Sequence, residues 1–137
     1  MGKWIGVPKN IKDYAGFVYC ITNKKTGKKY IGKKAFWAFR KLKPLKGKKR
    51  KRIQKKESDW RDYYGSSYLL HIDKETIGAK GFSRRILSCH KTRWEMSYHE
   101  ARLQFERKVL FRPDEYYNRY IGTRLRAPSN KIIGDNK

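Results

Sequence analysis

One glutamate near the C-terminal end of the chain stands where helical spacing gathers apolar residues. The residues three before, three after and four after Glu106 are Leu103, Val109 and Leu110. A helix projects such residues from one stripe, which normally faces the core. Because a buried carboxylate loses its hydration unless a cation meets it, two interpretations follow. Glu106 either forms a buried ion pair with an arginine or binds a divalent metal ion.

The other side chains of this region that could do chemistry are less distinctive. Glu100 has Ser97 three positions before it and Gln104 four positions after it, so we predict that it completes a capping box with Ser97 at a helix start. His99 lies seven residues before Glu106 on the same face and could flank a site there. Neither cysteine belongs to a C-x-x-C pair, so the sequence predicts no zinc site.

The charge of the chain points to a polyanionic partner. It has 36 Lys and Arg against 12 Asp and Glu, a formal net charge of +24. Seventeen of these cations lie between residues 24 and 56, where no acidic residue occurs. Such a segment favours binding to nucleic acid phosphates, although a solvated basic loop or a localisation signal has the same composition. The candidate nucleic-acid-binding residues are Lys34, Lys41, Lys48, Lys49, Arg50, Lys51 and Arg52.

The residue pattern predicts which elements position these side chains. Two segments rich in β-branched and aromatic residues flank a turn at Gly27, which predicts a β-hairpin. Ser67, Thr92 and Ser97 stand at capping positions before helical segments. We predict an α+β fold in which a small antiparallel sheet of about three strands is flanked by helices. The expected elements are strands at 16–22, 29–32 and 81–89, helices at 34–41, 58–64, 67–77 and 98–111, and a basic loop at 43–56.

The chain is expected to form one domain with short flanking segments. Its 137 residues can bury one core. The expected division is an N-terminal arm (1–14), a domain (15–120) with a basic insert at about 43–56, and a basic C-terminal tail (121–137). No apolar stretch is long enough to span a bilayer, no signal-peptide pattern opens the chain, and isolated cysteines are typical of reduced thiols. These features predict a soluble cytoplasmic protein with no membrane partner.

Two short motifs of the predicted hairpin resemble those of a known nuclease family. Val18-Tyr19, followed by Asn23 and then by Tyr30-Ile31-Gly32, is similar to the paired signature of the GIY-YIG nucleases. The members of this family are small α+β domains that cleave DNA phosphodiesters with one divalent metal ion. Phe17 stands where the family usually has glycine.

Further residues match the family in order and in near spacing. The family has an arginine about ten positions beyond the second motif tyrosine, a metal-binding glutamate on a later helix, and an asparagine about a dozen positions beyond that glutamate. These positions are matched by Arg40, Glu106 and Asn118. With the segments 59–67 and 102–106, the arrangement resembles the Seg-type GIY-YIG homing endonucleases of bacteriophages over about residues 15–120.

The resemblance implies metal-dependent hydrolysis of phosphodiester bonds in double-stranded DNA. Glu106 would hold Mg²⁺ or Mn²⁺, because hard cations prefer oxygen ligands. Arg40 would stabilise the charge that develops on the phosphate. Asn118 would hold the site together or contact the phosphate.

The two motif tyrosines would act on the attacking water. Tyr19 or Tyr30 would orient and deprotonate it, with cationic help from Lys33, because a phenol with an ordinary pKa of about 10 is a poor base at neutral pH. Which tyrosine takes which role stays open. Gly32 and Asn23 are expected to support the hairpin.

A second class of function fits the same charge. A non-catalytic basic DNA- or RNA-binding protein needs the lysines and arginines but has no use for Glu106 or for a divalent ion. If the chain is a nuclease of the phage type, the resemblance implies action in the host-cell cytoplasm. Cleavage of both strands would then call for a homodimer or a second encounter, since one site cuts one strand at a time.

Overall fold

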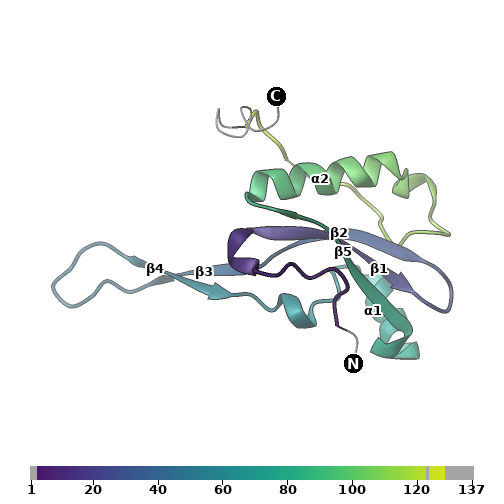
Figure 1. Cartoon of the computed structure of the whole chain (residues 1–137), viewed down its shortest axis with the longest axis horizontal. Coiled ribbons are helices and arrows are strands. Elements are labelled where there is room, and N and C mark those ends of the chain that lie inside the picture. The colour runs from purple at the N-terminus through teal and green to yellow at the C-terminus, as the bar shows by residue number, and fades with distance from the viewer. Residues whose placement is uncertain (1–2, 123, 129–137) are drawn as a thin grey trace.

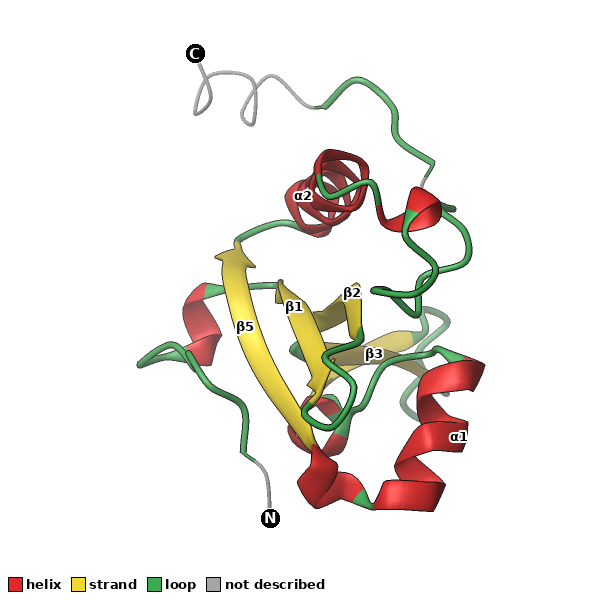
Figure 2. Cartoon of the chain, turned by 90° about the vertical axis from the view of Figure 1, so that its right-hand side faces the viewer, coloured by secondary structure: helices red, strands yellow, loops and turns green. Residues whose placement is uncertain are grey.

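A three-stranded antiparallel sheet forms the centre of the protein. The structure is a computed structural model that describes residues 3–122 and 124–128. The strand order is β2-β1-β5 (Figures 1 and 2). The strands are β1 (Gly16–Asn23), β2 (Lys29–Ala35) and β5 (Phe82–His90). The predicted hairpin and the predicted third strand are therefore confirmed, and with the helices described below they confirm the α+β class.

β1 is buried on both faces because its alternate residues enter different cores. Phe17, Tyr19 and Ile21 belong to one apolar cluster, and Val18 and Cys20 belong to a second one. A strand that is covered on both faces is expected to be continuously apolar. The run of residues 16–22 has this character, and β1 is accordingly the central, buried strand of the sheet.

The two helices lie on opposite sides of the sheet (Figure 2). α1 (Tyr68–Ile77) adds Leu70 to the cluster that contains Phe17. α2 (Arg93–Glu106) adds Met96 to the cluster that contains Val18. The fold therefore has three layers, with the sheet between the helices.

Both helices begin at a predicted cap. The hydroxyl of Ser67 accepts a hydrogen bond from the backbone N–H of Leu70 at 3.2 Å. The hydroxyl of Thr92 accepts one from the N–H of Glu95 at 3.1 Å, and the Glu95 carboxylate accepts from the same hydroxyl at 3.0 Å. The Thr92 hydroxyl therefore caps the first turn, and Glu95 bonds to that hydroxyl rather than to the backbone N–H of Thr92 that a full capping box would use.

The prediction of the last helix at 98–111 is wrong in its bounds. The helix begins at Arg93 and ends at Glu106, so Ser97 lies inside it rather than at its cap. Lys108 adopts a left-handed backbone conformation with φ of 53°, which stops the helix well before Pro113. The helical spacing that links Glu106 to Val109 and Leu110 in the sequence therefore does not exist in the fold.

The predicted helix at 34–41 and the predicted loop at 43–56 are also wrong. β3 (Trp37–Leu42) and β4 (Arg52–Glu57) pair as an antiparallel two-stranded sheet, called the ribbon below. It projects from the body of the protein (Figure 1). The spacing of Ala35, Ala38 and Phe39 suits a helix, but β4 offers a full set of hydrogen-bonding partners, and such context overrides a weak local preference.

The predicted helix at 58–64 is wrong as well. Residues 58–64 hold a single 3₁₀ turn, Trp60–Asp62.

The predicted N-terminal arm contributes to the core. Trp4 is 6% exposed and packs in the main core, and its indole N–H donates to the carbonyl of Trp60 at 2.7 Å. Of the predicted tail, residues 123 and 129–137 lie outside the described part. None of the helices in the described ranges is both long and apolar enough to cross a membrane.

Candidate functional site

A cleft of about 390 Å³ lies where β2, the start of α1, the middle of α2 and the segment after residue 116 meet. It is the natural candidate site, because it brings polar groups from four distant parts of the chain together. Its lining residues are Tyr30, Lys33, Ser66, Ser67, Tyr68, Leu69, Glu100, Gln104, Tyr117, Asn118, Arg119, Tyr120 and Gly122. Three of the predicted catalytic residues are among them, namely Tyr30, Lys33 and Asn118.

The two motif tyrosines occupy different depths. Tyr30 on β2 lines the cleft, and its hydroxyl lies 3.1 Å from the hydroxyl of Ser66. Tyr19 on β1 is 1% exposed and lies beneath it, with the two ring centroids 6.2 Å apart. Tyr19 is not among the lining residues. The structure therefore gives Tyr30 access to a substrate and gives Tyr19 a supporting place below it.

Glycine at position 32 is needed for this arrangement. Gly32 faces Tyr19 across the β1–β2 pairing. A Cβ atom on Gly32 would lie 2.5 Å from the Tyr19 hydroxyl oxygen and 3.0 Å from the Tyr30 ring, closer than nonbonded atoms approach. The expected supporting role of Gly32 thus has a steric basis.

Both phenols are held in the neutral form. Burial raises the pKa of Tyr19 well above its ordinary value, and the neighbouring Tyr63 and Tyr30 raise it further. Burial also raises the pKa of Tyr30, opposed by the Ser66 hydrogen bond and reinforced by the charge of Glu100. Neither group is poised to act as a base at neutral pH.

Glu106 lies outside the cleft and on the solvent-facing side of α2. Its side chain is 56% exposed and forms an ion pair with Arg102, whose Nη1 lies 3.0 Å from each carboxylate oxygen. The expectation that it faces the core is wrong, because the helix ends at Glu106 and the apolar residues beyond belong to another segment. Among the described residues, the structure does not bring Glu106 together with either tyrosine.

Glu100 occupies the place in the cleft that the sequence had assigned to Glu106. It is the only carboxylate among the lining residues, and its charge acts on both Tyr19 and Tyr30. Gln104, one turn later, is buried and donates to the carbonyl of Ile31 on β2 at 2.9 Å, which fixes this face of α2 against the sheet. The sequence signal for Glu100 is its position four residues after Met96 and four before Gln104, because residues four apart share one face of a helix.

Lys33 provides a positive charge on the opposite wall. It stands on β2, and its ammonium group donates to the hydroxyl of Ser97 on α2 at 2.6 Å. Arg119 is a second cation in the lining that sequence reasoning missed. Its guanidinium donates to the carbonyls of Tyr116 and Asn118 at 3.0 and 3.3 Å. No sequence signal marks Arg119, since it stands in a segment without regular structure.

Asn118 holds the edge strand of the sheet. Its side-chain oxygen accepts from the N–H of Ile31 at 3.0 Å, and its amide group donates to the carbonyl of Ile31 at 2.8 Å. The side chain is buried and thus acts as a clasp between β2 and the segment after α2. This geometry fits the expectation that Asn118 holds the site together, rather than a direct contact with phosphate.

Asn23 has a comparable role at the hairpin turn. Its side-chain oxygen accepts from the N–H of Lys25 at 3.0 Å, and its amide donates to the hydroxyl of Tyr117 at 3.0 Å. That hydroxyl donates in turn to Asp73 on α1 at 2.7 Å. Burial and the Asp73 carboxylate raise the pKa of Tyr117 to about 12. Asn23 therefore supports the cleft without lining it.

Arg40 and His99 are not brought to the cleft. Arg40 lies exposed on β3 of the ribbon. His99 stacks on His90 with ring centroids 4.5 Å apart, and its Nδ1 accepts from Arg102 at 3.1 Å. Burial and the charge of Arg102 lower the pKa of His99, which keeps it neutral.

The predicted nucleic-acid-binding cations fall into two places. Lys34 is held by the body, in an ion pair with Asp59 at 2.6 Å and with its ammonium group 4.2 Å from the centre of the Tyr63 ring. Lys41 and residues 48–52 belong to the ribbon and its tip. The ribbon thus carries most of these cations away from the cleft, on a separate surface.

The carboxylate of Glu100 fits a hard divalent ion. No group of three or more His, Cys, Asp or Glu that could hold a metal exists within the described ranges, so a site built wholly from protein ligands is not found there. Mg²⁺, however, is commonly held by one or two carboxylates, retained waters and substrate phosphate. One carboxylate in an open polar cleft has the donor set for that mode of binding.

Comparison with known families now identifies the class. The family model described as "Putative endonuclease segE, GIY-YIG domain" matches residues 4–121. The chain therefore belongs to the SegE-type GIY-YIG endonuclease domain family, as its sequence motifs predicted. Searches of curated proteins and of solved structures each found no match.

Proposed function

We propose that the chain hydrolyses phosphodiester bonds of double-stranded DNA in this cleft, with Mg²⁺ or Mn²⁺ held by Glu100. The observation that carries the proposal is the convergence of one carboxylate, two cations and an accessible phenol, from Glu100, Lys33, Arg119 and Tyr30, in one cleft of a GIY-YIG domain. These are the groups that phosphoryl transfer requires, because its catalysis is mainly positioning and charge stabilisation.

The metal role moves from Glu106 to Glu100 in this proposal. Glu106 forms an ion pair with Arg102 in solvent, whereas Glu100 lines the cleft and its charge raises the pKa of both phenols. When bound, the divalent ion would supply Lewis acidity that offsets the charge of the phosphate.

Lys33 and Arg119 take the charge-stabilising role that the family resemblance had given to Arg40. Lys33 is oriented by Ser97, and Arg119 is oriented by two backbone carbonyls. Cations held in this way need little reorganisation when negative charge develops on a phosphate oxygen.

Tyr30 positions the attacking water in this scheme. Its hydroxyl is neutral at pH 7 because burial raises its pKa. A neutral phenol can donate one hydrogen bond and accept another, so Tyr30 can hold a water between itself and a phosphate oxygen. Tyr19 fixes the Tyr30 ring from below.

The test is conversion of supercoiled plasmid to nicked or linear DNA with Mg²⁺ and with chelator, by the wild type, Glu100→Gln and Glu106→Gln. We expect wild type and Glu106→Gln to cut and Glu100→Gln to be inactive. Glu106→Gln is a matched control, since it removes the same charge from the same helix. Loss of cutting in Glu106→Gln alone would contradict the assignment of Glu100. Binding without cutting by the wild type over several divalent ions would favour a non-catalytic nucleic-acid-binding protein.

One cleft cuts one strand at each encounter, so nicked plasmid should precede linear plasmid. A homodimer, a phage homing role and action in a host cytoplasm remain part of the proposal. Linear product that appears without a nicked intermediate, together with a dimer in solution, would support paired sites.

A further inference from the structure

The pairing of β3 with β4 divides the ribbon into two faces. Residues directly opposite each other in an antiparallel pair lie on the same face, and the faces alternate along each strand. One face, called the anchored face, consists of Trp37, Phe39, Lys41, Ile53, Lys55 and Glu57. The other, called the open face, consists of Ala38, Arg40, Leu42, Arg52, Gln54 and Lys56.

The anchored face is held by the body at its root. The Trp37 indole donates to the carbonyl of Tyr14 at 3.0 Å, and the Lys55 ammonium lies 4.5 Å from the centre of the Trp37 ring. Arg93, at the start of α2, places its guanidinium 5.4 Å from the centre of the Phe39 ring and donates to the Trp37 carbonyl at 3.4 Å. These contacts hold the root of the anchored face to the body and fix the direction of the ribbon, while Arg40, Arg52, Gln54 and Lys56 of the open face are exposed.

The open face is built for recognition rather than for charge alone. It carries Arg40, Arg52 and Lys56 and no carboxylate. Arg40 lies directly opposite Gln54, and both are exposed. Within the described ranges, neither side chain has a hydrogen bond or an ion pair. Phosphate binding would explain the cations, but it gives no reason for a glutamine at the centre of the face.

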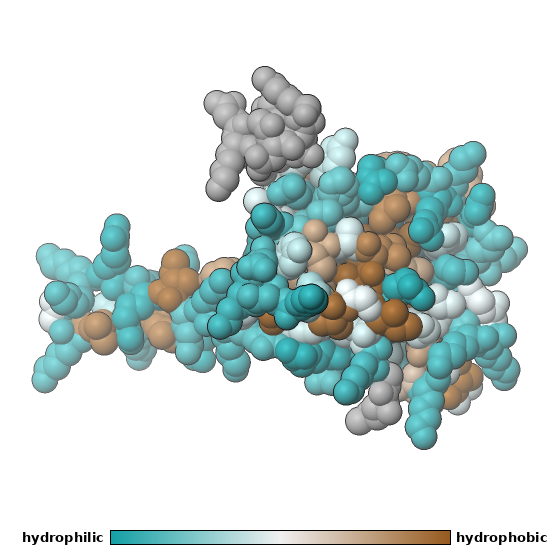
Figure 3. Space-filling model, viewed as in Figure 1, coloured by the Kyte–Doolittle hydropathy of each residue, from teal (hydrophilic) through white to brown (hydrophobic). Residues whose placement is uncertain are grey.

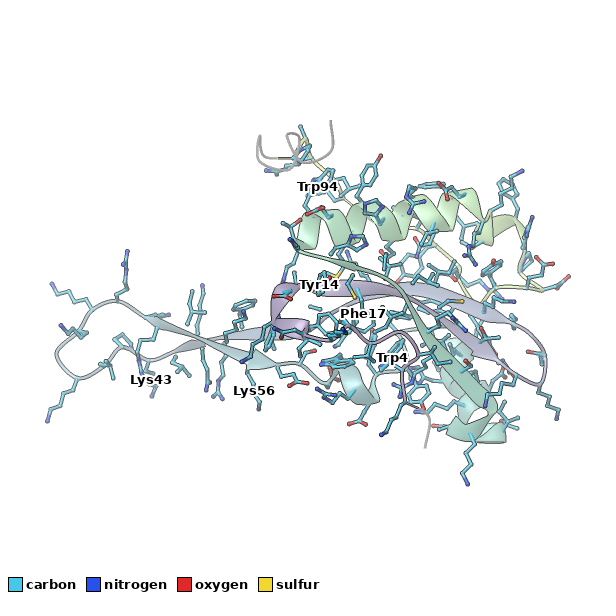
Figure 4. All side chains as sticks on the ribbon, viewed as in Figure 1. Trp4, Tyr14, Phe17, Lys43, Lys56 and Trp94 are labelled. Carbon is cyan, nitrogen blue, oxygen red and sulfur yellow. The ribbon has the colours of Figure 1, made fainter. Side chains whose placement is uncertain are left out.

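Arginine and glutamine are the side chains whose two-pronged geometry matches base edges. Arginine pairs with O6 and N7 of guanine, and glutamine pairs with N6 and N7 of adenine, both in the major groove. A two-stranded ribbon fits that groove, and strands of six residues are about 20 Å long. Figure 3 shows a largely hydrophilic ribbon on the viewed side, and Figure 4 places Lys43 far from the body and Lys56 near it.

We infer that the ribbon lies in the DNA major groove with its open face toward the bases, where Arg40 and Gln54 read sequence and the flanking cations contact phosphates. The inference rests on the proposed function for its choice of DNA as the partner. It replaces the expected catalytic role of Arg40 with a role in specificity.

The fold also limits the distance along the DNA between the base pairs that Arg40 contacts and the bond that is cleaved. Arg40 follows Tyr30 of the cleft by ten residues, so even a fully extended chain would separate their Cα atoms by at most about 35 Å. That length is about one turn of B-DNA. The preferred base pairs should therefore lie within about one helical turn of the cleaved bond.

The test selects bound duplexes from a library of randomised DNA, with the full chain in chelator so that no cleavage occurs. We expect a motif of a few base pairs containing guanine and adenine. The double variant Arg40→Ala/Gln54→Ala should lose that motif and bind the selected duplex about 10- to 100-fold more weakly, down to its affinity for random duplex.

The matched control is Lys41→Ala/Ile53→Ala. It removes the directly opposite pair on the anchored face and also one positive charge. This control should weaken binding to selected and random duplexes equally and keep the motif. Arg40→Lys, which keeps the charge but lacks the fork, should lose the guanine preference.

A wild type that selects no motif, or an Arg40→Ala/Gln54→Ala variant that keeps it, overturns the inference. Stronger binding to double-stranded RNA also overturns it, because the major groove of RNA is too narrow for the ribbon. Cleavage of plasmid is measured separately. A selected motif without any cleavage therefore supports base reading by the ribbon and contradicts the nuclease proposal. Cleavage without a motif supports the nuclease proposal and contradicts base reading by the ribbon.

Discussion

Two β-hairpins in the described part of the chain, β1–β2 and β3–β4, share an architecture and differ in burial. In β1–β2, both faces of β1 are covered, and the edge of β2 is clasped by Asn118. In β3–β4, every residue of β4 is exposed. The covered hairpin holds Tyr30 and Lys33 in fixed positions at the cleft, whereas the exposed hairpin holds a row of cations in solvent. The difference teaches that buried contacts fix side chains in place, whereas an exposed strand pair can present charge to solvent with little core of its own.

The stabilising terms of the two hairpins differ in kind. Phe17, Val18 and Ile21 of β1 have no exposed surface, and each such side chain stabilises the fold by about 1.5–3 kcal/mol. The ribbon has few apolar contacts, and its cations repel one another. A lone two-stranded hairpin is marginal in water, so the contacts of Trp37 and Phe39 with the body are what keep the ribbon formed.

The largest expected difference between the regions is kinetic. Glu100→Gln should lower kcat for plasmid nicking by about 10³-fold or more, with little change in the Kd for DNA. The reason is that it removes a group needed at the reacting phosphate but none of the ribbon's cations. Single-turnover cleavage and fluorescence anisotropy measure the two quantities. A variant with weakened binding and unchanged kcat would place Glu100 outside the site.

The reverse pattern should follow from removal of the ribbon. Replacing residues 40–54 by Asn-Gly joins Phe39 to Lys55 through a two-residue hairpin turn and deletes nine cations. We expect the Kd for DNA to rise about 100-fold or more, with the slope of log K against log salt reduced by about 0.9 for each lost phosphate contact. The melting temperature should stay within a few degrees of the wild type. Collapse of the fold in this variant would show that the ribbon belongs to the core.

A smaller difference is expected in how far one substitution in the body and one in the ribbon lower the free energy of unfolding. Asn118→Leu removes both hydrogen bonds to Ile31 and leaves its buried N–H without a partner, which should lower the free energy of unfolding by about 2 kcal/mol. Arg40→Leu on the ribbon should change it by less than about 0.5 kcal/mol. Denaturant titration of both variants provides the comparison, and equal losses would contradict it.

The smallest expected effect is a pH dependence of the folding stability that arises from His90 in the body and not from the ribbon. Burial and the neighbouring His99 lower the pKa of His90 to about 4, with Glu95 opposing this shift and Arg102 reinforcing it. Because the unfolded histidine takes up a proton near pH 6.5 and the folded one does not, this contribution is complete above pH 6.5 and is lost as the pH falls from there toward 4. For a half-exposed ring, screened by solvent, we expect about 1 kcal/mol.

Thermal unfolding between pH 4 and 7 measures this slope. His90→Gln should flatten it, while the ribbon deletion should leave it unchanged, since the deleted residues contain no histidine. A slope that disappears with the ribbon would assign the acid sensitivity to repulsion among its cations instead.

Local sequence signals located much of the body. The turn at Gly27, the caps at Ser67 and Thr92 and the apolar run of β1 were all readable, because each depends on neighbours within a few residues. The same holds for the motifs that led to the family. The ribbon was missed, because β3 and β4 are strands only through each other, and no short window of sequence contains both.

The sequence by itself determined the family, the α+β class and the strong positive charge, since motifs, hydrophobic pattern and composition are properties of the chain alone. Only the tertiary structure decided which glutamate and which cations enter the cleft. Glu100 and Glu106 lie on the same helix, and the choice between them depends on which face of that helix packs on β2, where Gln104 donates to the carbonyl of Ile31. Arg40 lies outside the cleft for a similar reason, because the pairing of its strand with β4, where Gln54 is its partner, directs β3 away from the cleft. Such contacts join distant residues, and their positions are fixed only when the whole fold is assembled.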